Sequence, residues 1–424
     1  MAIDPEELKK RRLLREKRRQ AQQRRRRQLL LRLGLALVVL ALVAGGIYLW
    51  SLPQDEQETP SQQEATQATQ ATQPTEPTSL PPTSVVHIAA AGDLNITSAV
   101  VQAGGDAHDY TKTFQDVACL LADADLAVLN FEGLLVGEPY GSTGSAPQAL
   151  AEALHSAGVD LVQMANSYSI SQGTLGLGTT LQNIRAAGME PLGAYASNEE
   201  YQQAKGYTIC EVEGVRIAFV AFTKGMNSMT LPAGSENCVN VLYEDYDSTY
   251  QDIDREKIAA VMTAVQQEEP DITIAMLHWG SEYNDTISQS QESIKKLFQS
   301  YGVDAIIGTH SHYVQKIEYD ETAGTLVAYS LGDFLGDAER SGSEYSIVLN
   351  MEITKDNTTG EAKITGYSYT PIFTVNQAGV PLQVVRLPQT IAAYEAEYIN
   401  RVSKTTYEAM TYALERVQAR ILGE

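Results

Sequence analysis

Short apolar runs alternate with amphipathic stretches from Val85 onward, and the alternation predicts a folded α/β domain. The apolar runs have the length of buried β-strands, and the amphipathic stretches have helical spacing. Strands are predicted over residues 85–91, 126–130, 160–165, 191–195, 207–213, 215–223, 271–277, 305–307, 325–331, 345–353 and 364–374. Helices are predicted over residues 113–125, 147–158, 179–188, 253–267, 292–301 and 392–422. Because the later part is rich in strands, we expect an α/β fold with mixed sheets.

An uncharged apolar run of 18 residues, Leu33 to Trp50, predicts a membrane span, and residues 29–31 extend it across Arg32. This length matches the hydrocarbon core of a bilayer, about 30 Å thick. Residues 9–27 are dense in Lys and Arg, which places this flank in the cytoplasm. We therefore expect a single-pass anchor over 29–50 in the lipid of the cell membrane, a cytoplasmic N-terminus and an extracellular main domain. A cleaved signal peptide is the alternative.

Charge is divided unevenly along the chain. Residues 1–32 carry 13 Lys and Arg against 4 Asp and Glu, while the rest carries 18 against 49. An acidic main body repels phosphate, so we expect no nucleic-acid partner. The three cysteines, Cys119, Cys210 and Cys238, are few and odd in number, so they do not indicate a framework of disulfide bonds. Cys119 lies in an apolar helical pattern and is predicted to be a buried thiol. The sequence does not decide whether Cys210 and Cys238 form a disulfide.

Composition divides the chain into five segments. The stretch after the apolar run contains ATQATQATQPTEPT and no Lys or Arg, so it cannot bury enough apolar surface to fold. The predicted segments are a basic cytoplasmic segment (1–28), the anchor (29–50), a disordered linker (51–84), the α/β domain (85–388) and a C-terminal helix (389–424). The C-terminal helix is predicted to brace the domain, with an oligomer contact as the alternative.

Polar residues follow several of the predicted strands directly. Asp93, Glu132, Asn166, His278 and His310 each lie just beyond an apolar run. Open α/β sheets bind ligands at the carboxyl ends of their strands, so we expect these side chains to converge. His312 follows His310 at a spacing that places both side chains on one side of an extended backbone.

Carboxylates together with imidazoles predict a divalent-metal site. This set of donors suits Mn, Zn or Fe(II) better than Ca. The predicted ligands are Asp93, Glu132, Asn166, His278, His310 and His312. Two ions about 3.5–4 Å apart would activate water for attack at phosphorus, and the count, one ion or two, stays open. Lys224 is a candidate lining residue, with a plain surface lysine as the alternative.

The order of these motifs resembles the CapA/PgsA family of poly-γ-glutamate capsule biosynthesis proteins. The resemblance covers roughly Val85 to Thr374 and rests on Gly92-Asp93, Asn130-Phe131-Glu132-Gly133, HWGSEY at 278–283, GTHSH at 308–312 and YSLGDF at 329–334. It implies a metallophosphoesterase-like α/β/β/α sandwich with mixed sheets, here preceded by one transmembrane helix. It also makes Glu282, Asp333 and Tyr168 candidates for catalytic roles.

One motif departs from the family pattern Ala-Asn-Asn-His-x-x-Asp-x-Gly. Residues 165–173, ANSYSISQG, keep the first Asn and the last Gly, but Ser167 and Tyr168 replace the second Asn and the His. In related phosphoesterases the Asn-His pair supplies a metal ligand and the acid that protonates the leaving group. A tyrosine, with an unperturbed pKa near 10, is a poor acid at neutral pH.

Two functions therefore remain open. The first is a membrane-tethered, metal-dependent hydrolase or transfer factor in capsule polymer synthesis or export. The second is a non-catalytic family member that binds an anionic envelope polymer or scaffolds a synthase. In either case the expected partners are membrane lipid, capsule synthase membrane subunits and the polymer itself.

Overall fold

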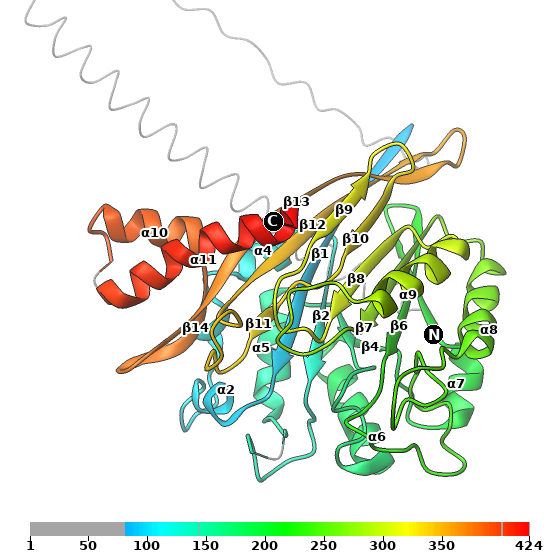
Figure 1. The fold of residues 1–424 in the computed structure, drawn as a ribbon, viewed down its shortest axis with the longest axis horizontal. Coiled ribbons are helices and arrows are strands. Elements are labelled where there is room, and N and C mark those ends of the chain that lie inside the picture. The colour runs from blue at the N-terminus through cyan, green and yellow to red at the C-terminus, as the bar shows by residue number, and fades with distance from the viewer. Residues whose placement is uncertain (1–80, 143, 400–401, 424) are drawn as a thin grey trace, which may run out of the picture. The chain divides into compact units, whose positions relative to one another are not determined.

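A computed structural model describes residues 81–142, 144–399 and 402–423 (Figure 1). The predicted basic segment, the predicted anchor and nearly all of the predicted linker lie outside these residues. No helix in the described ranges is both long and apolar enough to cross a membrane. The first strand begins at Thr83, close to the predicted start of the domain.

Eight strands of the described residues form a first mixed sheet in the order β14-β13-β12-β1-β2-β3-β4, with β11 beside β1. The strands are β1 (Thr83–Asn95), β2 (Leu126–Glu132), β3 (Leu161–Gln163), β4 (Glu190–Leu192), β11 (Asp333–Leu335), β12 (Tyr345–Asp356), β13 (Ala362–Gln377) and β14 (Val380–Arg386). Strands β1 to β4 run parallel, whereas β12 to β14 are antiparallel additions beside β1.

Six strands form a second mixed sheet in the order β5-β6-β7-β8-β10-β9 within the described part of the chain. They are β5 (Tyr207–Val212), β6 (Val215–Thr223), β7 (Ile272–His278), β8 (Ala305–Thr309), β9 (Ile317–Asp320) and β10 (Thr325–Ala328). The central four are parallel, and β5 and β9 are antiparallel edges. The predicted α/β fold with mixed sheets is confirmed.

Helices cover both sheets. They are α2 (Ser98–Gln102), α3 (Thr111–Phe114), α4 (Ala118–Ala122), α5 (Gln148–Ala157), α6 (Gly173–Ala186), α7 (Asn198–Ala204), α8 (Arg255–Gln266), α9 (Gln289–Ser300), α10 (Leu387–Glu395) and α11 (Lys404–Leu422). The apolar faces of α8 and α9 pack on the side chains of Ala218, Val220 and Phe222, which alternate along β6. Phe219, on the other face of β6, is fully buried. This face lies toward the first sheet, because β4 contacts β6 and β1 contacts β8.

Tertiary contacts divide two of the predicted helices. The stretch predicted as one helix over 113–125 forms α3 and α4, because Asp116 between them accepts hydrogen bonds from the backbone and the guanidinium of Arg386. The predicted C-terminal helix is also two helices, α10 and α11. Glu397 after α10 takes a left-handed φ of 58°, and the Ser403 side chain caps α11.

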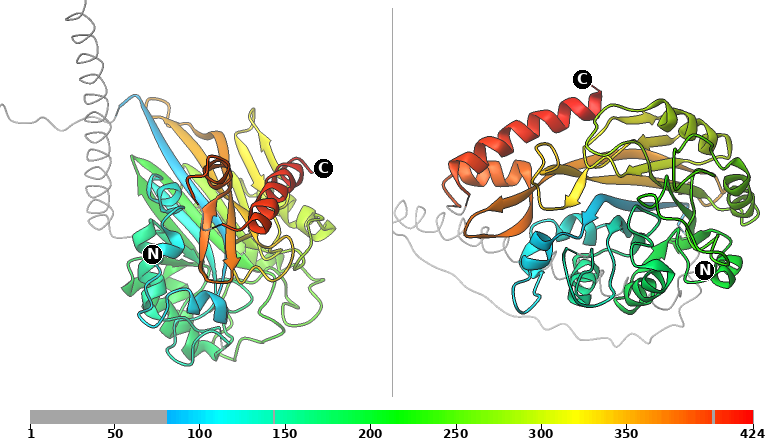
Figure 2. Two further views of the ribbon diagram at one scale, coloured as in Figure 1. Left: turned by 90° about the vertical axis from the view of Figure 1, so that its left-hand side faces the viewer. Right: turned by 60° about the horizontal axis from the view of Figure 1, so that its bottom comes forward.

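Helix α11 packs on β12 and β13, as both views in Figure 2 show, and so braces the first sheet. Near its end, the Arg420 guanidinium lies 4.7 Å from the ring centre of Tyr313 and 5.1 Å from that of Tyr345. It also pairs with Asp285 at 3.4 Å. The helix therefore supports the loop after β7 and the loop after β8.

The cysteines are all free thiols. Cys210 and Cys238 are buried without a bridge. Cys119 is exposed, so the prediction of a buried thiol is wrong: α4 is short, and only its Leu121 is buried against the sheet.

Two glycines let strands approach one another closely beneath the polar strand ends. A Cβ added at Gly92 would lie 1.8 Å from the carbonyl oxygen of Gly332. One added at Gly308 would lie 1.9 Å from the Tyr329 carbonyl oxygen and 2.5 Å from the Trp279 indole nitrogen, which donates to that same oxygen. Only glycine fits at these contacts.

We expect Gly308→Ala to lower the free energy of unfolding by about 2 to 3 kcal/mol, because the added methyl group has no space between β7 and β10. Gly366→Ala in β13 is the matched control, since a Cβ there meets nothing within 4 Å. Guanidinium unfolding of the two variants beside the parent protein measures the difference. Equal stability of the two variants would contradict the close-packing argument.

Candidate metal centre

The polar residues predicted at the strand ends converge at one edge of the two sheets. Asp93 and Glu132 lie at the ends of β1 and β2, and His278 is the last residue of β7. His310 follows β8 directly. All four side chains are buried, and their arrangement depends on parallel strands that bring their carboxyl ends to one place.

A first cluster joins Glu132, His278 and His310. One ligand atom from each lies within 4.8 Å of the others. The His278 Nδ1 atom is 3.4 Å from Glu132 Oε1, and the ring centres of the two histidines are 4.5 Å apart.

A second cluster of the same compactness joins Asp93, His312 and Asp333. His312 Nδ1 lies 2.8 Å from Asp333 Oδ1 and 3.7 Å from Asp93 Oδ2. Asp333, a candidate catalytic residue from the sequence, therefore lies among the predicted ligands. Strand β11 brings it there by pairing with β1 at Asp93.

The two clusters touch. The backbone N–H of His310 donates to Asp93 Oδ2 at 3.0 Å. The Asn130 side-chain amide donates to Asp93 Oδ1 at 2.7 Å and to Glu132 Oε1 at 3.0 Å. Asn130 thus links one carboxylate of each cluster. The sequence analysis names Asn130 only as part of a motif. Its position two residues before Glu132 could have indicated that both side chains lie on the same face of β2.

The histidine pair divides between the two clusters. The expected extended backbone is wrong here, because φ is 88° at His310 and 58° at His312. Left-handed backbone is uncommon for residues other than glycine and concentrates at functional sites. The turn sends each ring to a different set of carboxylates, with ring centres 6.3 Å apart.

Neighbouring polar groups hold the His278 ring. Its Nδ1 atom lies 3.0 Å from the Thr309 hydroxyl, which donates to Gln163 Oε1 at 3.3 Å. Its Nε2 atom accepts from the backbone N–H of Ser167 at 3.3 Å. Gln163 is a site residue that the sequence analysis missed, although a Gln within the apolar β3 was an available signal, and Thr309 entered only as part of the GTHSH motif.

Asn166, predicted as a ligand, uses its side-chain amide within the protein. Its Nδ2 donates to Asn130 Oδ1 at 3.0 Å and to the Phe131 carbonyl at 2.7 Å, and its Oδ1 accepts from the Tyr168 N–H at 2.9 Å. Asn166 therefore orients Asn130. The Tyr168 side chain is 36% exposed and does not line the cavity beside the clusters.

Burial sets the protonation of the carboxyl groups. It raises the pKa of Asp93 to about 6, against the lowering effect of His312. Burial, and then the Asp93 charge, raise the pKa of Glu132 well above its usual range. Burial also raises the pKa of Asp333. Three carboxyl groups are thus held where their negative charge is poorly solvated.

The histidines behave differently from one another. Burial lowers the pKa of His278 and of His310 well below the usual value, which keeps these imidazoles neutral, and the partnerless Nδ1 of His310 is open to an ion. Burial also acts to lower the pKa of His312, but Asp333 and the other carboxylates outweigh it and raise that pKa well above the usual value.

These residues fit a divalent cation. The Nδ1 atom of His310 is buried and has no hydrogen-bond partner, which is the state of a donor atom shaped for a ligand. Buried carboxylates beside it need a positive charge. Oxygen and imidazole nitrogen donors together are compatible with a divalent metal site.

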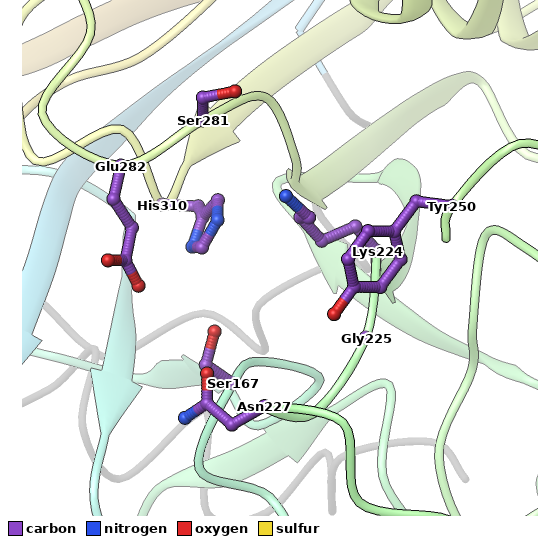
Figure 3. Close-up of a pocket in the computed structure, with 8 residues that line it drawn as sticks. All are labelled: Ser167, Lys224, Gly225, Asn227, Tyr250, Ser281, Glu282 and His310. Atoms are coloured by element: carbon purple, nitrogen blue, oxygen red, sulfur yellow. The ribbon is translucent and has the colours of Figure 1, made fainter. Parts of the chain in front are cut away.

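A cavity of about 270 Å³ opens beside the first cluster (Figure 3). It is lined by Ser167, Lys224, Gly225, Asn227, Tyr250, Ser281, Glu282 and His310. The candidate lining residue Lys224 and the candidate catalytic residue Glu282 both belong to this wall. His310 belongs to the cavity and to the first cluster, so a molecule in the cavity would contact the cluster directly.

Comparisons with known proteins agree with the motif order. The family described as "Bacterial capsule synthesis protein PGA_cap" matches residues 87–338, more than half of the chain. "Capsule biosynthesis protein CapA" of Bacillus anthracis is 26% identical over 259 residues, which are 59% of this chain and 59% of that protein. "PGA biosynthesis protein CapA" of Bacillus subtilis (strain 168) is 27% identical over 209 residues, 48% of this chain and 50% of that protein. The chain therefore spans about half to three-fifths of the length of these curated relatives.

Solved structures also resemble the chain. A novel phosphatase of Mycoplasma pneumoniae has a TM-score of 0.40 at 14% identity, covering 68% of this chain and 94% of that one. A hypothetical protein of Thermus thermophilus has a TM-score of 0.41 at 14% identity, covering 67% of this chain and 98% of that one.

We expect His310→Ala and Asp333→Asn each to weaken divalent-metal binding by about 10-fold to 100-fold or more, since the first removes a nitrogen donor from one cluster and the second removes a negative charge from the other. Metal content by mass spectrometry and Mn²⁺ or Zn²⁺ titration measure the loss. Glu321→Gln, an exposed acid between β9 and β10, is the control and should bind as the parent protein does. Parent-like affinity in both site variants would contradict the assignment of the clusters.

Proposed function

The chain belongs to the bacterial capsule synthesis protein family PGA_cap, and from this premise we propose that it is a metal-dependent hydrolase or transfer factor acting on a capsule polymer or its precursor. The observation that carries the proposal is the pair of adjacent buried clusters, Glu132/His278/His310 and Asp93/His312/Asp333. If this edge of the two sheets served only to stabilise the fold, it would not need three buried carboxyl groups beside three imidazoles.

The metal in this proposal is Mn, Zn or Fe, as one ion or two, held by the two clusters. An ion held there supplies Lewis acidity and activates water for attack at neutral pH. The chain's own residues prepare that attack. Asn130 holds Asp93 and Glu132 in position, Ser167 and Thr309 fix the His278 ring, and Glu282 and Lys224 face a substrate in the cavity.

The setting that we propose is the outer face of the cell membrane. An anchor over residues 29–50 and a linker over 51–84 would hold the acidic domain near a growing polymer. Synthase membrane subunits are the proposed protein partners. The part of the chain after residue 32, with 18 Lys and Arg against 49 Asp and Glu, would repel an anionic polymer, so binding would need local positive charge at the site.

Chelation tests the hydrolase. We expect treatment with a chelator to abolish cleavage of γ-linked glutamate polymer by the purified full-length protein, and Mn²⁺ or Zn²⁺ to restore it, because the proposed attack uses water activated by the metal. His278→Ala should stay inactive after metal is restored. Cleavage that survives both chelation and His278→Ala would overturn the proposal.

A second candidate function rests on Tyr168. Burial raises the pKa of Tyr168, which makes it a still weaker acid than an ordinary tyrosine. A site that lacks a leaving-group acid would bind polymer without turning it over. In that case the protein would bind an envelope polymer or scaffold a synthase.

Tyr168→His distinguishes the two candidates. If the site is a hydrolase that lacks only its acid, we expect the imidazole to raise the cleavage rate by about 10² to 10⁴. Tyr168→Phe is the control and should change the parent rate little, because a phenol with a raised pKa is a weak acid for a leaving group at neutral pH. Absence of cleavage in the parent and in Tyr168→His, with normal metal content in both, would favour the non-catalytic binder.

A further inference from the structure

The two clusters differ in their surroundings. His310 of the first cluster lines the cavity, and the Glu282 side chain lies in the same wall (Figure 3). None of the second cluster's residues, Asp93, His312 and Asp333, is among the described residues that line this cavity. An ion at the first cluster would therefore meet a molecule in the cavity, whereas an ion at the second cluster would have different neighbours.

Tyr283, the residue after Glu282, lies against the second cluster. Its ring stacks on His312 with centres 4.8 Å apart and planes inclined by 26°. Its backbone has a left-handed φ of 53°, and its N–H donates to the Ser311 carbonyl at 2.8 Å. Left-handed backbone is uncommon for a bulky residue and persists only where the surrounding structure enforces it. The loop after β7 thus directs one side chain to the cavity and the next one to the second cluster.

An arginine covers the Tyr283 ring. The Arg340 guanidinium carbon lies 4.0 Å from the ring centre, within the range of a cation–π contact. Arg340 is exposed, whereas the side chain of His312 is buried. From solvent inward, the guanidinium, the phenol ring and the imidazole are therefore three successive contacts that end at the second cluster.

The segment that carries this arginine is anchored at several points. Residues 336–343, called the capping segment below, lie between β11 and β12. The Tyr313 hydroxyl donates to the Ser341 carbonyl at 2.8 Å. The Asn376 side-chain amide of β13 donates to the Asp337 carbonyl at 2.7 Å. These bonds hold the capping segment to the first sheet and to the loop after β8, so its arginine is kept over the phenol ring.

We propose that Tyr283 and Arg340 form a cap over the second cluster, which orients His312 toward an ion and makes that ion exchange slowly, while an ion at the first cluster exchanges through the cavity. The inference rests on the proposed function and deepens it, because it assigns the substrate-facing ion to the first cluster. Groups around a metal ligand orient the ligand and control the access of solvent to the ion. An ion leaves when water replaces its ligands, so the ring must move away before the second ion is released.

Release of Zn²⁺ from the purified full-length protein into an excess of chromogenic chelator tests the cap. We expect two phases in the parent protein, a fast one from the first cluster and a slow one from the second. His310→Ala should remove the fast phase, and Asp333→Asn should remove the slow phase. These two variants assign each phase to its cluster.

Tyr283→Leu should speed the slow phase by about 10-fold to 100-fold, since loss of a group that orients a metal ligand typically weakens binding by this factor. Arg340→Gln should speed it by about 2-fold to 10-fold, the contribution of a cation–π contact near the surface. Tyr283→Phe keeps the ring and Arg340→Lys keeps the charge, so both should retain most of the slow release. The fast phase should stay unchanged in all four variants, whereas a general loss of stability would alter both phases.

The sign of the Arg340→Gln effect separates a cap from simple electrostatics. A positive charge beside a cation repels it, so removal of the charge alone would slow the release of Zn²⁺. The cap predicts faster release. Arg255→Gln, at an exposed arginine that begins α8, is the matched control and should release Zn²⁺ as the parent protein does.

Two results would overturn the inference. One is release from the parent protein in a single phase. The other is a slow phase that neither Tyr283→Leu nor Arg340→Gln speeds. Metal content is measured before each release experiment. Bound metal with an unchanged slow phase rejects the cap alone, whereas a parent protein that holds no metal after loading rejects the proposed function and the cap with it.

Discussion

Three carboxyl groups buried against three imidazoles are the constraint on which the rest of the site depends. An unpaired buried charge costs several kcal/mol, so Asp93, Glu132 and Asp333 need donors or a cation nearby. The protein supplies part of this through the Asn130 amide and the His310 N–H. The partnerless Nδ1 of His310 and the raised pKa of each carboxyl group show that the compensation from the protein is incomplete. A divalent ion held by the two clusters would provide what is missing, which is why these residues are compatible with a metal site.

The scaffold is built to keep these groups in contact. Gly92 and Gly308 let the ends of β1 and β8 pack closely against the backbone of residues 329–332, which leads from β10 to β11. On the open side, the Tyr283 ring stacks on His312 with centres 4.8 Å apart, and Arg340 covers Tyr283 at 4.0 Å. Through Arg420, α11 supports the loops that carry Glu282 and His312. The C-terminal helices lie beyond the part of the chain that matches the family, yet they support its site.

The substitution of Tyr168 for histidine is most instructive when its neighbours are considered. Asn166, which precedes it by two residues, still hydrogen-bonds Asn130, and Ser167 still contacts His278. The segment therefore keeps its contacts to the clusters although a tyrosine stands at the position of the histidine in the family pattern.

The sequence by itself determined the fold class, the positions of most strands and the set of polar residues at the strand ends. These follow from local periodicity and from the rule that parallel strands end together. It also singled out Lys224 and Glu282. Only the tertiary structure decided that His310 and His312 serve different clusters, because that depends on left-handed backbone at both residues. Likewise, Asp333 joins Asp93 through pairing of β11 with β1, two segments far apart in sequence that no local pattern connects. The cavity beside His310 also arises from contacts between distant segments, because the loops after β6 and β7 both line it.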